Sequence, residues 1–287
     1  MMDILKAVVY GIVEGITEWL PISSTGHLIL VEQLIPFTGV TEGFFDMFDV
    51  VIQLGAIMAV VVLFWKQIWP FRMPEAGTKN GPAGKAGFMD YINKDIMTLW
   101  FKILVSCVPA AVIGILFDDV LEALFYNPVS IAIALIVFGM AFIIIETWNK
   151  GRRPKITSLA QISYQTAVMI GVFQVIAAVF PGTSRSGATI VGALLIGVSR
   201  TIAAEYTFFL AIPVMFGASL LKLVKFGFAF EGAEILTLLT GTVVSFIVSL
   251  FVLKFLMGYI KKHDFKVFGW YRIILGIIVL IYFWALV

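Results

Sequence analysis

The sequence predicts an all-α polytopic membrane protein, and three observations support this fold class. Of the 287 residues, 61% are hydrophobic and 13% are charged, and the mean hydropathy is +1.02, whereas soluble domains have about 45–50% apolar and about 25% charged residues. Six apolar segments are long enough to span a bilayer, which takes roughly 20 helical residues. Two further apolar segments are shorter and contain a proline. We therefore expect a single membrane domain over residues 1–287.

Composition also excludes other classes of protein. A net charge of +2 is too small, and the apolar segments are too long, for a nucleic-acid-binding protein. Cys107 is the single cysteine, which excludes an intramolecular disulfide, and its apolar neighbours predict a small buried side chain. A cleavable signal peptide is not expected, because Lys6 is the one basic residue near the N-terminus and Glu14 and Glu18 interrupt the apolar run.

In chain order, the long segments predict six spanning helices and the short ones predict two helix-break-helix pairs. Proline ends a helix, and the hydroxyl residues that follow it can cap the next one. The long segments are Phe44–Trp65, Ile96–Phe117, Pro128–Trp148, Ile202–Val224, Ile235–Met257 and Val267–Val287. The short segments are Ile4–Leu20 and Thr25–Ile35 around Pro21, and Leu159–Phe180 and Gly187–Ile196 around Pro181.

The two interrupted segments resemble each other. Each is followed by three spanning segments, so we expect two repeat halves, residues 1–148 and 159–287, each with one re-entrant pair and three spanning helices. A shift of 160 positions without a gap pairs Gly11 with Gly171, Glu14 with Gln174, Pro21 with Pro181, Ser23 with Thr183 and Ser24 with Ser184.

The charges of the connections predict the orientation. The connections at residues 66–95, 149–158 and 258–266 are basic, whereas residues 118–127 are acidic. Under the positive-inside rule the basic connections, including the loop 66–95, are cytoplasmic. With three crossings per half, both termini lie outside, the first pair enters from outside and the second from the cytoplasm. The odd number of crossings inverts one half relative to the other, and the two breaks should meet near the bilayer midplane.

Glu14 and Glu18 are four residues apart and therefore share one face of the first half-helix. A charge at the bilayer centre costs about 2.5–3.5 kcal/mol, so we expect this pair to have a partner or a role. Two such carboxylates either share a proton or coordinate a divalent cation, Mg²⁺ or Ca²⁺, through their oxygens. The alternative is a solvated pair on an external face.

Ser23, Ser24 and Thr25 open the second half-helix, where unpaired N–H groups and the helix dipole favour an anion such as phosphate. His27 lies three residues after Ser24 and four after Ser23, so its ring can reach either hydroxyl. A hydroxyl beside an imidazole can activate a nucleophile or a water molecule. A serine cap with a structural histidine is the alternative.

The second break has the composition of a phosphate-binding loop. Arg185 offers a planar fork of donors suited to phosphate, unless it snorkels to the surface. The hydroxyls can donate to oxyanions, and the glycines let the backbone approach a ligand. The other residues of this predicted loop are Gly182, Thr183, Ser184, Ser186 and Gly187.

The runs E-G-I-T-E-W-L-P-I-S-S-T-G-H and P-G-T-S-R-S-G resemble the two signature motifs of the bacterial undecaprenyl-diphosphate phosphatase family, also known as bacitracin-resistance proteins. Length, segment order and both motifs agree over essentially the whole chain. The resemblance implies hydrolysis of undecaprenyl diphosphate to undecaprenyl phosphate and inorganic phosphate, which recycles the lipid carrier for cell-wall synthesis. It implies a bacterial plasma-membrane enzyme whose site faces outside and is formed by Glu14, Glu18, Ser24, His27 and Arg185.

The mechanism expected from these residues holds the diphosphate on Arg185 and on the half-helix N–H groups, with a divalent cation on Glu14 and Glu18 and the polyprenyl tail along the apolar walls. The nucleophile stays open between Ser24, His27 and water. Because broken helices in an inverted repeat are also typical of secondary transporters, a carrier or flippase for an anionic lipid or solute is the alternative.

Three further sets of residues in the spanning segments carry expectations. Asp49 and Gln53, one helical turn apart, could line the site, and a polar pair at the membrane interface is the equal alternative. Glu146 lies near a helix end and is expected to face a loop or the interface. Gly241 and Ser245, four residues apart, indicate close helix packing within the chain or in a homodimer.

Overall fold

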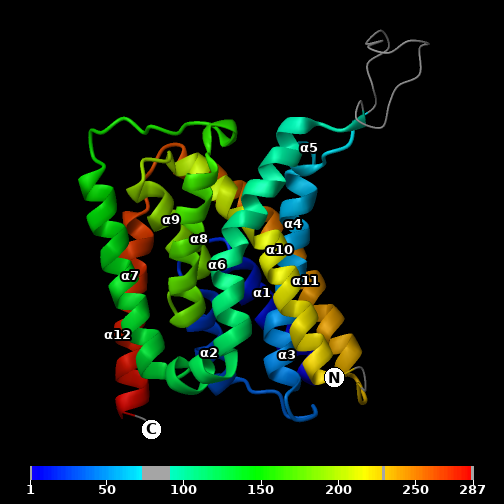
Figure 1. The fold of residues 1–287 in the computed structure, drawn as a ribbon. Coiled ribbons are helices and arrows are strands. Elements are labelled where there is room, and N and C mark those ends of the chain that lie inside the picture. Colours follow the sequence, from blue (N-terminus) through cyan, green and yellow to red (C-terminus); the bar gives the residue numbers. More distant parts are fainter. Residues whose placement is uncertain (1, 73–90, 228–229, 286–287) are drawn as a thin grey trace, which may run out of the picture.

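The computed structural model is a helical bundle (Figure 1) and describes residues 2–72, 91–227 and 230–285. Over these ranges it contains no β-strand, only two isolated β-bridges. The α-helices are α1 (Met2–Thr17), α2 (Ser24–Leu34), α3 (Phe44–Val51), α4 (Gln53–Leu63), α5 (Trp65–Ile68), α6 (Lys94–Phe125), α7 (Pro128–Trp148), α8 (Tyr164–Val179), α9 (Arg185–Leu195), α10 (Arg200–Phe226), α11 (Glu234–Ile260) and α12 (Lys266–Ala285).

Six segments are long and apolar enough to cross a membrane, which confirms the number of spanning segments expected. The first consists of α3 and α4, which join at Ile52 without leaving helical dihedral angles. The predicted acidic connection at 118–127 is wrong in its bounds, because α6 remains helical as far as Phe125. Of the predicted loop 66–95, residues 73–90 lie outside the described residues, as do 286–287 of the last predicted segment.

Each interrupted segment forms two helices joined by a short break. Ser23 and Ser184 cap α2 and α9, and their side chains accept hydrogen bonds from the backbone N–H groups of Gly26 (3.3 Å) and Gly187 (3.2 Å). These two serines have positive φ angles of 76° and 68°. The capping residues are therefore 161 positions apart, so the ungapped alignment of Ser23 with Thr183 is wrong by one residue after the break.

Close helix packing depends on small residues. The helix α1 packs along α11, and α8 packs along α6. A Cβ atom on Gly11 would lie 2.6 Å from the carbonyl oxygen of Gly241, and one on Gly171 would lie 2.5 Å from that of Ser106. One turn further along α1, a Cβ atom on Gly15 would lie 2.8 Å from the carbonyl oxygen of Ser245. Gly241 and Ser245 are thus used inside the chain, which is the first of the two expectations for them.

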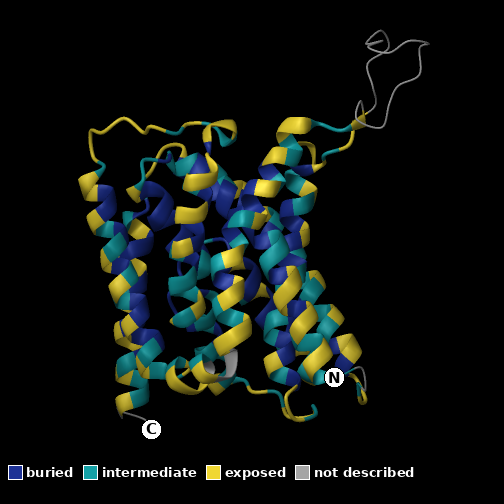
Figure 2. Ribbon diagram, viewed as in Figure 1, coloured by how far each residue is buried: buried dark blue, intermediate teal, exposed yellow. Residues whose placement is uncertain are grey.

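The surface of the bundle is apolar. Ile115 (76% exposed), Phe251 (71%) and Ile144 (67%) are among many large hydrophobic side chains that point outward. Figure 2 shows exposed residues along the outward faces of the helices and buried residues in the interior. Such an exterior suits lipid as the surrounding medium, and the chain is a multi-pass membrane protein. The interior contains α9, which is buried throughout from Ser186 to Leu194.

The two ends of the bundle differ in the connections that they carry. Both termini and the connection from α6 to α7 lie at one end, and α5 and the connection from α7 to α8 lie at the other (Figure 1). We call these the terminal end and the basic end. The breaks after α1 and α8 lie between the two ends, in the interior.

Candidate active site

Glu18 connects the two breaks. The residue is 6% exposed. Its carboxylate accepts two hydrogen bonds, one from the Ser24 hydroxyl to Oε2 (3.0 Å) and one from Arg185 Nη2 to Oε1 (3.0 Å). Ser24 and Arg185 are the first residues of α2 and α9. One carboxylate therefore joins the starts of two half-helices that are far apart in the sequence.

Glu14 lies one turn before Glu18 on α1 and is completely buried. Neither of its carboxylate oxygens has a hydrogen-bond partner among the described residues. A buried carboxylate without a partner carries a large desolvation cost, which a proton or a bound cation removes. Over the described ranges, no group of three or more acidic, histidine or cysteine side chains gathers to hold a metal. A cation at Glu14 would need further oxygen ligands from a substrate or from water.

Arg185 is held inside the bundle, which excludes the alternative of a surface-snorkelling arginine. Its side chain is 12% exposed, and Nη1 donates to the carbonyl oxygen of Thr207 (2.9 Å) while Nη2 binds Glu18. The Nε atom is buried and has no partner among the described residues. The hydrogen bonds of Nη1 and Nη2 thus fix the orientation of the guanidinium, and Nε remains as a donor for a ligand.

The hydroxyl groups of the two breaks have different environments. The Ser186 hydroxyl donates to the backbone carbonyl of Glu18 (3.3 Å) and lies 3.0 Å from the Ser184 hydroxyl. The Thr183 hydroxyl is buried and has no partner within the described part of the chain. Because Ser23 and Ser184 use their side-chain oxygens as helix caps, their hydroxyls support the backbone at the starts of α2 and α9.

The two glycines of the second break accommodate protein contacts. Gly182 has φ +88°, and a Cβ atom there would lie 2.6 Å from the carbonyl oxygen of Ile131. A Cβ atom on Gly187 would lie 2.9 Å from Arg272 Nη1. These close approaches explain the glycines without requiring a ligand.

The His27 ring hydrogen-bonds neither of the two hydroxyls, Ser23 and Ser24, that its spacing places within reach. Its Nδ1 lies 2.7 Å from the carbonyl oxygen of Ser23, and its Nε2 lies 2.7 Å from the Tyr271 hydroxyl. Since a carbonyl only accepts, Nδ1 carries the proton, and in the neutral ring Nε2 accepts from Tyr271. The proton acceptor beside the Ser24 hydroxyl is instead the carboxylate of Glu18.

Arg272 on α12 is a site residue that the sequence analysis missed. It is completely buried and donates only to backbone carbonyls: Nη1 to Pro21 (3.3 Å), Nη2 to Gly182 (3.0 Å) and Thr183 (2.7 Å), and Nε to Leu135 (3.5 Å). It therefore binds the two breaks to each other. An arginine within a spanning segment was the available signal, because such a charge is costly in a bilayer. The neighbouring Tyr271 carried no comparable signal.

A cavity of about 230 Å³ lies beside the two breaks. Thr25 contributes from the start of α2 and Pro181 from the second break, and Asp49, Gln53 and Lys222 contribute from the spanning helices. Asp49 and Gln53 thus line a cavity next to the site. The lining also includes the connection from α6 to α7, which lies at the terminal end of the bundle (Figure 1).

These features define a multi-pass membrane protein with a buried ionic site between two interrupted helix pairs. Carboxylates, hydroxyls, a guanidinium and helix N-termini gather there, a set of groups suited to binding and activating a phosphate ester or anhydride. The family model of bacitracin resistance protein BacA matches residues 7–278, and the chain belongs to this family.

Relatives match over nearly the full length. The undecaprenyl-diphosphatase of Desulfitobacterium hafniense is 61% identical over 285 residues, which cover 99% of this chain and 98% of that protein. Undecaprenyl-diphosphatase 1 of Clostridium acetobutylicum is 62% identical over 282 residues, with 98% of each chain covered. The undecaprenyl-diphosphatase of Enterococcus faecalis is 60% identical over 280 residues, which cover 98% of this chain and 97% of that protein.

Proposed function

We propose that the chain hydrolyses undecaprenyl diphosphate to undecaprenyl phosphate and inorganic phosphate and so returns the lipid carrier to cell-wall synthesis. Family membership and relatives named undecaprenyl-diphosphatase support this activity. The structural observation that carries it is Glu18, held between the Ser24 hydroxyl and the Arg185 guanidinium. A binding site for transport alone needs no hydroxyl aimed at a general base, and the transporter alternative gains no support from the relatives.

The roles proposed for the residues follow from these contacts. Arg185 and the N–H groups of the first turns of α2 and α9 hold the terminal phosphate. Glu18 takes the proton from the attacking oxygen, which is either the Ser24 hydroxyl or a water molecule in its place. A new P–O bond forms at the terminal phosphorus as the anhydride bond breaks, and undecaprenyl phosphate leaves. In the serine route, water then hydrolyses the phosphoserine.

His27 offers a third route. Its Nε2 lone pair accepts from the Tyr271 hydroxyl, so it can attack phosphorus or take a proton only when that hydrogen bond is released. We assign the nucleophile to Ser24 or water in preference to His27, because only the Ser24 hydroxyl already donates to a carboxylate.

A divalent cation is part of the proposal, with Glu14 as its main protein ligand. The two unpartnered, buried oxygens of Glu14 support this, whereas both oxygens of Glu18 are engaged. Mg²⁺ and Ca²⁺ prefer oxygen ligands, and Mg²⁺ commonly binds one or two carboxylates together with substrate phosphates. When bound, the cation would neutralise charge on the diphosphate.

We further propose that the halves form an inverted repeat of re-entrant pairs, with site and termini on the outer side of the plasma membrane. The packing supports this, because exchanging the halves converts the contact of α1 with α11 into that of α8 with α6, and leaves the pair of α7 and α12 unchanged. The basic connections at the end opposite the termini support the orientation (Figure 1). Thr38→Cys should react with an impermeant maleimide on intact cells, and Lys262→Cys should not; the reverse pattern would contradict the orientation.

Phosphate release from undecaprenyl diphosphate in detergent tests the activity. We expect Glu18→Gln and Arg185→Ala each to lower kcat by at least about 10²-fold, the usual effect of losing a general base or an oxyanion ligand. The control is Arg72→Met, because Arg72 is exposed and is distant in the sequence from both breaks. Labelled terminal phosphate trapped on the wild type but not on Ser24→Ala would identify the serine route. Activity that survives both site substitutions would refute the site.

A further inference from the structure

A second cavity, of about 810 Å³, opens at the basic end of the bundle. Its lining comes from the end of α7, the connection to α8, the connection from α9 to α10, and the ends of α10 and α11. Six cationic side chains and one carboxylate, that of Glu146, are among the lining residues. The cations are Lys150, Arg152, Arg153, Lys155, Arg200 and Lys261.

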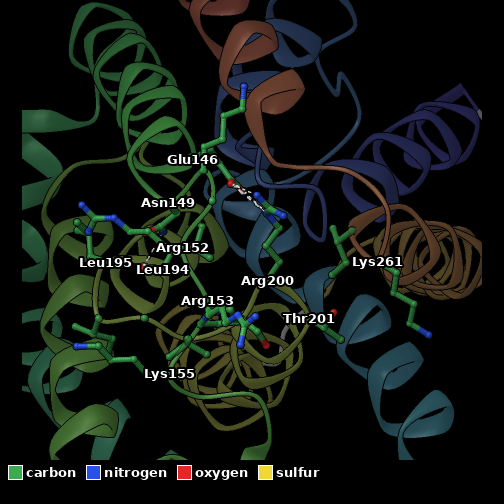
Figure 3. Close-up of a pocket in the computed structure, with 18 residues that line it drawn as sticks. Glu146, Asn149, Arg152, Arg153, Lys155, Leu194, Leu195, Arg200, Thr201 and Lys261 are labelled. Atoms are coloured by element: carbon green, nitrogen blue, oxygen red, sulfur yellow. Dashed lines mark hydrogen bonds and ion pairs between the residues drawn. The ribbon is translucent and has the colours of Figure 1, made fainter.

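The centre of this cavity is built around an ion pair whose carboxylate is buried and whose guanidinium is partly exposed. Glu146, expected at a loop or interface, is instead 2% exposed and accepts from Arg200 Nε at 2.8 and 3.1 Å. The backbone N–H of Phe265 donates to the same carboxylate (3.0 Å). Figure 3 shows this pair in the middle of the lining residues, with Arg152 and Lys155 on one side and Lys261 on the other. Glu146 is therefore neutralised by Arg200, and the remaining cations have no opposing carboxylate in the lining.

The walls of the cavity are fixed by backbone contacts. The N–H groups of Lys155 and Ile156 donate to the Gly197 carbonyl (2.8 and 3.1 Å), and the Ser199 N–H donates to the Ile156 carbonyl (2.8 Å). Gly197 has φ +89°, and the stem of Lys155 would lie 3.3 Å from a Cβ atom there. These contacts hold the connections 150–155 and 196–199 together, so the backbone that carries these cations is fixed around the cavity.

Two further observations favour an anionic ligand. Ser199, Arg200 and Thr201 place the N-terminus of the 27-residue helix α10 in the lining, and Ser199 makes no side-chain cap hydrogen bond. Acidic neighbours offset only part of the charge, since Glu205 interacts with Lys261 and Asp264 with Arg200. The connection 150–155 therefore carries most of the excess positive charge.

The position of the cavity favours a ligand from the membrane. Leu195, in the lining, is 40% exposed, and Trp148, the residue before the lining residue Asn149, is 50% exposed. The guanidinium of Arg152 lies 4.6 Å from the centre of the Trp148 ring. Exposed tryptophan and arginine at the end of a spanning helix are typical of the level of lipid head groups. The positive-inside rule requires only a number of charges on this side of the membrane and does not explain why six cationic residues line one cavity.

We propose that this cavity binds a phosphate group, presented by the head group of an anionic lipid in the adjacent leaflet. Basic pockets between spanning helices bind phosphate-bearing lipid head groups in this way, and the volume lies within the range of ligand pockets, about 300–1,000 Å³. The site is separate from Glu14, Glu18 and Arg185, and the proposal requires no step of the hydrolysis.

Binding to the purified chain in detergent tests this proposal. Native mass spectrometry measures the affinity for cardiolipin and, for comparison, phosphatidylcholine. The pocket variant is Arg153→Gln with Lys155→Gln, and the control is Lys66→Gln with Lys262→Gln, which removes two exposed cations from the same end outside the lining. We expect about thirtyfold weaker cardiolipin binding for the pocket variant, since each basic residue near a membrane surface contributes ~1 kcal/mol. The control should change by less than about threefold.

The remaining outcomes are also decisive. The same difference between the two variants with inorganic phosphate alone would support the phosphate site and assign its ligand to solution. The proposal would be overturned if both variants lost cardiolipin affinity equally, or if neither lost any. It would also be overturned if the wild type bound cardiolipin no more tightly than phosphatidylcholine and did not bind inorganic phosphate. If the pocket variant does not fold, Lys150→Gln with Lys261→Gln removes two charges from positions just after α7 and α11 for the same comparison.

Discussion

Arg272→Met should separate the position of the two breaks from the stability of the bundle. The guanidinium donates to Thr183 (2.7 Å) and Gly182 (3.0 Å) in one break and to Pro21 (3.3 Å) in the other. Hydrogen bonds from a charged donor contribute about 1.5–3 kcal/mol each, so the two short ones amount to roughly 3–6 kcal/mol. Removing a buried cation recovers several kcal/mol of desolvation cost, and methionine fills a similar volume. The net change in stability is therefore small.

The expected effect on catalysis is large. Without Arg272 nothing else that we describe donates to the carbonyls of both breaks, and a displacement of about 1 Å between reacting groups can cost about 10²-fold in rate. We expect kcat for undecaprenyl diphosphate to fall by about 10²-fold. KM should stay within about threefold, because Arg272 is completely buried and its guanidinium donates to backbone carbonyls. Arg272→Lys keeps the charge but not the fork of donors, so its kcat should be intermediate.

The measurements are phosphate release, with kcat and KM resolved, and thermal unfolding in the same detergent. Arg72→Met makes the same side-chain change at an exposed position and should alter neither. The melting temperature of Arg272→Met should change by less than about 5 °C. A loss of activity that merely follows the loss of folded protein, or a kcat equal to the wild type, would refute the role of Arg272 in positioning the breaks.

Three other substitutions test separate parts of the structure. Gly171→Ala should destabilise the bundle by about 1–3 kcal/mol, because its Cβ would lie 2.5 Å from the Ser106 carbonyl oxygen; thermal unfolding measures this. Glu14→Gln should raise the Mg²⁺ concentration for half-maximal activity at least about tenfold, because the carboxylate proposed as the main ligand is lost. Tyr271→Phe should lower kcat less than His27→Ala does and alter the pH profile of kcat, since it removes the hydroxyl that donates to the imidazole.

Each of these has its own contrary result. Gly114→Ala is the matched control for the glycine on α8, since no atom of another helix lies within 4 Å of its added Cβ, and it should be neutral or stabilising by up to ~1 kcal/mol. Equal destabilisation by both alanines would contradict the close-packing argument. An unchanged Mg²⁺ requirement in Glu14→Gln would remove this residue from the cation site. An unchanged pH profile in Tyr271→Phe would show that its hydrogen bond does not influence His27.

The fold class was predictable because it depends on local properties. Apolar segments of about 20 residues must be helical in a bilayer to satisfy their backbone groups, so length and composition suffice to find them. The two breaks were also visible, since proline followed by hydroxyl residues stops one helix and caps the next. The register of the repeat was wrong by one residue, because nothing in the sequence shows which of Thr183 and Ser184 adopts the positive φ angle of the cap.

The sequence by itself determined the medium, the number of spanning segments and the residue types that gather at the breaks. Only the tertiary structure decided which partner each side chain takes. Glu18, and not His27, accepts from the Ser24 hydroxyl, and Arg272 reaches both breaks from the last helix. These contacts join residues about 6 to 251 positions apart, and the longer ones depend on how helices pack, which spacing along a single helix cannot specify.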